Sequence, residues 1–137
     1  MSVKSEDKIL AGIAHLGIFL NVVGFVGVLI IYLVKKEASH FVRDHAKQAL
    51  GYQVIILIIS WMITLIFMGG AIGGIVSGTI FNLPQIMPGF MGSMIIFGII
   101  RGGLSLLIFG YAVYAAIQAL QGKGFKYVVI GEFVDRI

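Results

Sequence analysis

The chain alternates between long apolar runs and short charged segments. Residues 9–34 contain no Asp, Glu, Lys or Arg, and from Gln48 to Gly122 the only charged side chain is Arg101. A transmembrane helix needs about 20 mostly apolar residues. The pattern therefore predicts three membrane spans, at approximately 9–34, 48–78 and 93–120. We expect a single helical membrane domain over residues 1–137, an all-α bundle of about three transmembrane helices with a cytosolic amphipathic loop and a C-terminal interfacial helix.

The first apolar run leaves two arrangements open. As one helix, residues 9–34 would measure about 39 Å, which fits one tilted span across a hydrocarbon core of about 30 Å. Asn21 and two glycines weaken its middle, so a helix broken between Asn21 and Gly27 also fits. We favour one span. A fourth membrane segment agrees with the charge pattern only if one segment is re-entrant.

Small residues recur at three- or four-residue steps in the later runs, and they let helix backbones approach closely. The two rows are Gly70, Gly74 and Gly78, and Gly98, Gly102, Ser105, Ala112, Ala116 and Ala119. Between them, residues 79–92 hold Pro84 and Pro88, which disfavour a helix, so we expect an uncharged second loop there. In the tail, Tyr127, Ile130, Val134 and Ile137 can share the apolar face of an interfacial helix.

The composition of the chain excludes a soluble protein. The chain is 59% hydrophobic and 12% charged, whereas soluble domains carry about 25% charged residues. The net charge of +4 resides mainly at the ends of the apolar runs, without the basic stripe expected of a nucleic-acid binder. No cysteine is present, which excludes disulfides and thiolate metal sites. We expect a multi-pass protein of the cell (inner, cytoplasmic) membrane.

The distribution of Lys and Arg predicts the orientation. The first loop carries Lys35, Lys36, Arg43 and Lys47, the second loop carries none, and the tail carries Lys123, Lys126 and Arg136. Positive charge favours the cytoplasmic side. The sequence thus predicts that residues 35–47 and the C-terminus are cytoplasmic and, with three spans, that the N-terminus lies outside.

Arg101 is the one charge inside a predicted span. A charge at the centre of a membrane helix costs about 2.5–3.5 kcal/mol on insertion scales. Arg101 then either lines a pore or binds a partner, facing polar groups such as Gln53, His15 or Asn21, or it reaches the outer interface because the third helix begins later. His15 and Asn21, in the first run, are expected to hydrogen-bond across helices.

The first loop invites a search for catalytic or metal chemistry. His40 and His45 are five residues apart, so they lie on different helical faces, and no further metal-ligand motif accompanies them. No nucleophile elbow, phosphate loop or dinucleotide fingerprint is present. We predict no catalytic residue, no cofactor and no metal. A lipid-acting enzyme that uses His45 and Asp44 is the least favoured hypothesis.

The first loop also has a structural interpretation. Ser39 is a candidate N-cap, and Asp44 can reach Gln48 four residues later. His45, Gln48 and Tyr52 share one face of the helix as it enters the membrane. This face has hydrogen-bonding capacity at headgroup level, where it could hold a lipid headgroup, a partner's loop or the protein's own C-terminal tail.

Residues 41–53, FVRDHAKQALGYQ, resemble the signature of a family of small bacterial membrane proteins that includes the magnetosome protein MamF and is related to the twenty-kilodalton Tic component of the chloroplast import translocon. Ala14-His15-Leu16, Lys35-Lys36 and AAIQALQGKGFKY (115–127) match it too. The chain departs from the pattern at Gly51-Tyr52, where Asn-Phe is commoner, in a first run without proline, at Val128 and in a longer glycine-rich and proline-containing stretch.

The resemblance implies a small helical bundle without known catalysis, with roles in protein import or in organelle membrane assembly. Combined with the small-residue rows, it favours a non-enzymatic scaffold or assembly factor. Such a protein would be a homo-oligomer or would bind another membrane protein, in contact with the lipid bilayer and not with nucleic acid. A channel or transporter subunit is the alternative, motivated by Arg101 and Gln53.

Overall fold

The computed structural model describes residues 3–81, 86–128 and 131–136, and all regular structure within them is helical. The elements are α1 (Ser5–Leu16), the 3₁₀ turn η1 (Gly17–Leu20), α2 (Asn21–Lys35), α3 (His40–Phe81), α4 (Ile86–Leu120) and α5 (Gly131–Asp135). Three stretches are long and apolar enough to cross a membrane: Ser5–Lys35, His40–Gly78 and Phe90–Leu120. This confirms the predicted all-α membrane class.

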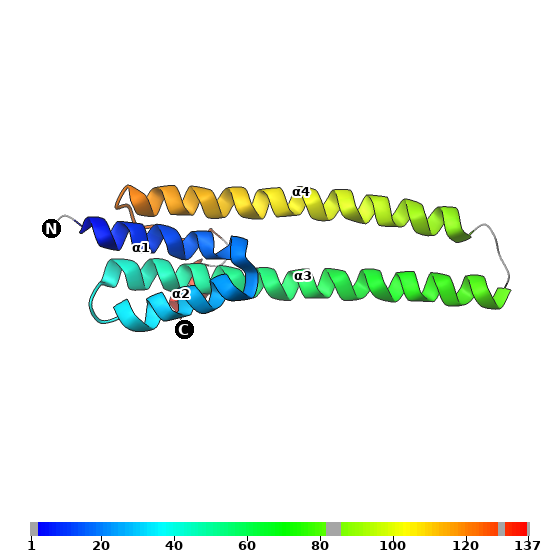
Figure 1. The fold of residues 1–137 in the computed structure, drawn as a ribbon, viewed down its shortest axis with the longest axis horizontal. Helices are drawn as coiled ribbons and strands as arrows, with labels where there is room; N and C mark the ends of the chain where they lie inside the picture. The colour runs from blue at the N-terminus through cyan, green and yellow to red at the C-terminus, as the bar shows by residue number, and fades with distance from the viewer. Residues whose placement is uncertain (1–2, 82–85, 129–130, 137) are drawn as a thin grey trace. The chain divides into compact units, whose positions relative to one another are not determined.

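The first apolar run is folded back on itself. Asn21 has φ 51° at the point where η1 ends and α2 begins, and α2 returns alongside α1 (Figure 1). Helix α2 packs closely against η1 at Gly24, where an added Cβ would collide with the backbone of Gly17. Of the two arrangements open from the sequence, the broken helix is therefore the one observed, with its bend at Asn21.

Polar contacts join the two ends of this hairpin. Lys35 Nζ donates to Glu6 Oε1 at 2.7 Å, and Ser39 Oγ donates to Asp7 Oδ2 at 2.9 Å. Groups in direct contact cannot lie on opposite faces of a membrane. The expectation of an N-terminus on the side opposite to residues 35–47 is inconsistent with these contacts, because it assumed that the first run crosses once.

Both loops are shorter than the charge and proline pattern predicted. Helix α3 begins at His40, and Ser39 caps it by accepting a hydrogen bond from the Val42 backbone N–H at 3.4 Å, as predicted. Beyond the expected end at residue 78, α3 continues to Phe81. Helix α4 tolerates Pro88 because the first turn of a helix has no use for the missing N–H. Pro84 lies outside the described residues.

The chain divides into two compact units, one formed by residues 1–56 and 108–137 and the other by Leu57–Leu107. The first unit has a well-packed interior in two clusters: Ala14, Val28, Ala46 and Ala49, and Ile18, Tyr52, Ala112, Ala115 and Tyr127. The C-terminal part of the predicted small-residue row, Ala112, Ala116 and Ala119, is buried here.

The second unit has little internal packing. Phe67 of α3 and Phe97 of α4 stack with ring centroids 3.9 Å apart. Most of its large apolar side chains are exposed, among them Ile66 and Ile99. Four glycines of the predicted packing rows stand in open space, with no atom within 4 Å of an added Cβ: Gly70, Gly74, Gly98 and Gly102.

The tail does not form the interfacial helix predicted for it. After Leu120 the chain runs without regular structure, and the only described helix in the tail is α5, five residues long. Tyr127 and Val134, two members of the expected apolar face, are buried within the first unit instead of facing outward. Ile130 and Ile137 lie outside the described residues.

Candidate functional site

Two buried histidines meet in the first unit. His15 comes from α1 and His45 from the second turn of α3, and they are 1% and 2% exposed. His15 Nε2 lies 2.9 Å from His45 Nδ1, and His15 Nδ1 lies 3.0 Å from the hydroxyl of Tyr127. His45 Nε2 lies 3.1 Å from the carbonyl oxygen of Lys123. These four groups form one hydrogen-bonded chain, the histidine chain, which runs from Tyr127 in the tail through His15 of α1 and His45 of α3 to Lys123 in the tail.

The partners assign the protons in the histidine chain. A carbonyl oxygen only accepts, so Nε2 of His45 carries a hydrogen and donates to Lys123. With both rings neutral, His45 Nδ1 then accepts from His15 Nε2–H, and His15 Nδ1 accepts from the Tyr127 hydroxyl. Every polar atom of both rings is satisfied by this single direction of donation.

Tyr127 is held by its own environment. Its ring stacks on Tyr52, with centroids 4.0 Å apart and planes 4° from parallel. Burial, together with the neighbouring Tyr52 and Tyr111, raises the pKa of Tyr127 well above its ordinary value. The hydroxyl therefore keeps its proton and acts as the donor that the assignment of His15 requires.

Gln48 fixes the end of the tail. Its Nε2 donates to the carbonyl of Gly131 at 3.1 Å, and its Oε1 accepts from the backbone N–H of Tyr127 at 3.4 Å. Close approach is allowed by Gly51, since a Cβ there would run into Val134. The departure from the family pattern at Gly51 thus has a structural reason. Of the three partners predicted for this face of α3, the protein's own tail contacts it in the described part of the chain, and the other two stay predictions.

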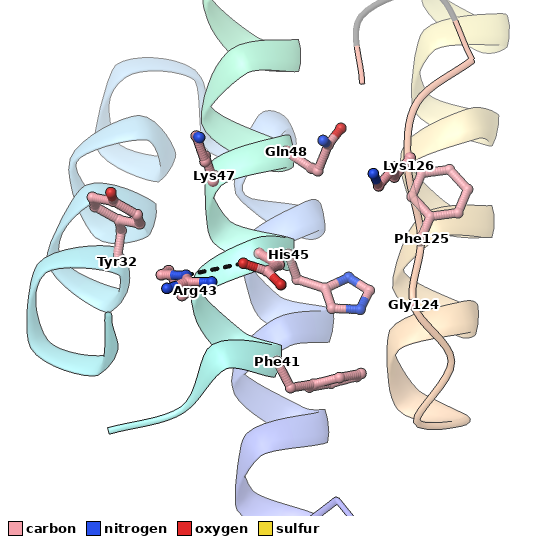
Figure 2. Close-up of a pocket in the computed structure, with 10 residues that line it drawn as sticks. Tyr32, Phe41, Arg43, His45, Lys47, Gln48, Gly124, Phe125 and Lys126 are labelled. Carbon is pink, nitrogen blue, oxygen red and sulfur yellow. Dashed lines mark hydrogen bonds and ion pairs between the residues drawn. The ribbon is translucent and has the colours of Figure 1, made fainter. Parts of the chain in front are cut away.

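The same part of α3 borders a cavity of about 880 Å³. Figure 2 shows α3 between Tyr32 of α2 on one side and the tail segment from Gly124 to Lys126 on the other. Three cationic side chains line the cavity: Arg43, Lys47 and Lys126. Asp44, which also lines it, accepts from Arg43 Nε at 3.0 Å.

Comparison with known protein families identifies the family of this chain. Residues 6–134 match the sequence model of the magnetosome magnetite crystal formation protein family (MamF and MmsF). The chain belongs to this family. No curated protein and no solved structure matches it.

The match includes the whole histidine chain, since His15, His45 and Tyr127 all lie within the residues that match the MamF and MmsF family. It confirms the resemblance to MamF stated from residues 41–53. The relation to the Tic component is not shown by this comparison and stays an expectation. The family description concerns crystal formation and names no enzymatic reaction.

Three polar residues singled out in the sequence lie outside the histidine chain in this member of the MamF and MmsF family, and the two alternatives for Arg101 stay open. Asn21 is exposed at the bend of the hairpin, because a positive φ is tolerated by Asn better than by most residues. Arg101 is exposed on α4 and makes no ion pair among the described residues. Gln53 is 4% exposed, and neither atom of its amide has a hydrogen-bond partner in the described part of the chain.

The hydrogen bonds of the histidine chain hold α1, α3 and the tail together and leave no group free for catalysis in His45. Both nitrogens of His45 are engaged, so the ring lacks a free basic atom for the hypothetical lipid-acting enzyme. His40 is exposed and is not a member of the histidine chain. Across residues 3–81, 86–128 and 131–136, no group of three or more His, Cys, Asp or Glu side chains is placed to hold a metal ion.

Tyr127 is the main member of the site that sequence reasoning missed. It was assigned to the apolar face of an interfacial helix, although its hydroxyl is a donor to His15. The available signal was the pairing requirement itself: His15 lies in an apolar run and needs a hydrogen-bond partner when buried, and a tyrosine of the tail is a candidate donor.

Proposed function

We propose that this protein is a non-enzymatic membrane scaffold that supports formation of a mineral crystal at the membrane, through helix packing between copies of the chain. The first unit acts as a rigid anchor in this proposal. The second unit supplies the surface for association.

One observation carries the proposal, namely that four glycines of the predicted packing rows have open space where a side chain would be. Gly70 and Gly74 on α3, and Gly98 and Gly102 on α4, each leave open space where a side chain would be. Glycines four residues apart form flat strips that admit a second helix backbone. The most apolar stretches of α3 and α4 bury no residue inside the chain, so this surface is available to another copy.

The topology that accompanies this proposal has two full crossings. Helices α1 and α2, of 12 and 15 residues, would measure about 18 and 22 Å, less than the hydrocarbon core of about 30 Å. We infer a re-entrant hairpin, with the N-terminus, the first loop and the tail together on the cytoplasmic side. With Lys4→Cys and Lys36→Cys, a membrane-impermeant maleimide should label both positions from the same side of sealed vesicles; labelling from opposite sides would reject this topology.

The absence of cysteine from the chain allows a face-specific test of association. We expect Gly70→Cys and Gly74→Cys to form disulfide-linked dimers on oxidation of native membranes. Gly69→Cys and Gly73→Cys are matched controls, because they also stand in open space but lie about 100° around the helix from their neighbours. Recovery of monomer alone from every variant, with no other protein captured, would contradict the scaffold.

A channel or transporter subunit is the second candidate. Gln53 favours it, because a buried amide without a partner is a binding group for a solute or an ion. The test is flux through proteoliposomes that contain the protein alone or with its captured partners. No flux in either case would remove this candidate and leave the scaffold unaffected.

A further inference from the structure

The cavity beside the histidine chain has the charge of an anion-binding site. Its wall carries the cations Arg43 and Lys47 against one carboxylate, that of Asp44, so positive charge predominates there, and Lys126 also lines it. The bond from Arg43 to Asp44 uses only Nε. A guanidinium has five N–H donors, so the other four can bind an oxyanion.

The volume of the cavity and the apolar part of its wall indicate a ligand larger than an inorganic anion. Ligand cavities commonly measure about 300–1,000 Å³, and this one, at about 880 Å³, is at the large end of that range. Aromatic side chains from three segments share the wall with the cations: Tyr32, Phe41 and Phe125. A ligand with an anionic group and an adjoining apolar portion satisfies both kinds of wall.

The position of the cavity along the chain supplies the third argument. Residues 41–48 are the first turns of α3, just before its long apolar stretch, and residues 124–126 follow the apolar end of α4. Both walls therefore stand where membrane helices emerge from the hydrocarbon. Basic pockets between helices at this level bind anionic lipid headgroups.

We propose that this cavity binds the phosphate-bearing headgroup of an anionic phospholipid. Arg43 and Lys47 contact the phosphate oxygens, and the aromatic side chains cover the start of the acyl chains. The site is separate from the glycine strips of the second unit, so it goes beyond the scaffold proposal. It can stand or fail on its own.

Lipid retention measured by native mass spectrometry tests the proposal on the full-length protein. The protein is extracted from nanodiscs of phosphatidylcholine mixed with phosphatidylglycerol, and we expect it to retain phosphatidylglycerol selectively. In the double variant Arg43→Gln/Lys47→Gln, this retention should fall by on the order of tenfold or more. Lys4→Gln/Lys36→Gln removes the same charge away from the cavity wall and should retain the lipid.

A second variant blocks the space without altering charge. Gly124 lines the cavity and has no atom within 4 Å of an added Cβ, so Gly124→Leu should fold normally and displace the lipid. Gly27→Leu, at a glycine that is equally open but is not in the cavity wall, should not.

Three results would overturn the proposal. Equal loss of lipid from both double variants would indicate diffuse surface attraction. Full retention in Gly124→Leu would place the lipid elsewhere. Displacement of the lipid by millimolar inorganic phosphate, with equal binding of phosphate in neutral detergent, would assign the cavity to the free anion and not to the headgroup.

Discussion

The two units of the chain differ in what their side chains contact. In the first unit, hydrogen bonds with defined donors join helices α1 and α3 to the tail through His15, His45, Gln48 and Tyr127. In the second unit, the described side chains between Leu57 and Leu107 show one stacked aromatic pair across α3 and α4. Gly70, Gly74, Gly98 and Gly102 have open space where a side chain would be.

The difference indicates a division of labour. A polar network buried away from water is costly unless every member is satisfied, and when satisfied it specifies one arrangement. Exposed apolar helices with glycine strips specify no arrangement within the chain, and they gain from packing against another membrane helix. The same kind of substitution should therefore have different consequences in the two units.

The largest difference is expected between two kinds of glycine. In Gly24→Leu, the new side chain would meet the Gly17 backbone, which cannot rotate away, so the first unit should lose about 3 kcal/mol or more of stability. The measurement is the free energy of unfolding in bicelles on titration with dodecyl sulfate.

Gly27→Leu and Gly74→Leu are the controls for this experiment. Both glycines stand in open space, so each variant should change the free energy of unfolding by no more than about 0.5 kcal/mol. Gly74→Leu should instead reduce self-association. Equal destabilisation by all three substitutions would remove the distinction between the two units.

A smaller effect is expected from breaking the histidine chain. His15→Leu leaves the Tyr127 hydroxyl and His45 Nδ1 buried without their partner, and each unpaired group costs about 1–3 kcal/mol. Release of the tail should accompany the loss, and protease cleavage after Lys126 would report it. His40→Leu, at an exposed histidine, is the matched control and should leave the tail protected. A tail that remains protected in His15→Leu would show that the histidine chain does not hold it.

Sequence reasoning succeeded where the bilayer alone dictates the answer. The apolar runs around residues 48–78 and 93–120 were sufficient to predict long membrane helices, and periodicity was sufficient to place His45, Gln48 and Tyr52 on one face. The preference of serine for helix N-caps was sufficient to predict that Ser39 caps α3.

It failed where long-range contacts decide. The hydropathy of residues 9–34 gives the length of the apolar run but does not show that the run folds back. The contact between Glu6 and Lys35 therefore could not be predicted from it. The amphipathic spacing of the tail is visible in the sequence and predicts a place at the membrane surface, whereas the surroundings of Tyr127 are assembled from α1, α3 and α4. The packing role of Gly70 and Gly74 remains a prediction, since no other part of the chain lies within 4 Å of a Cβ added at either position.

The smallest expected change in the free energy of unfolding comes from substituting two buried glutamines of α3. Gln48 is fully engaged with the tail, so Gln48→Met should destabilise the first unit by about 1–3 kcal/mol. Gln53 is equally buried, but its amide has no partner in the described part of the chain. Gln53→Met removes an unsatisfied polar group and should therefore stabilise the unit, by about 1 kcal/mol. Dodecyl sulfate titration of the two variants gives both signs in one assay. Destabilisation by Gln53→Met would mean that the amide is satisfied by a bound water or solute, and it would strengthen the channel alternative at the expense of a purely structural first unit.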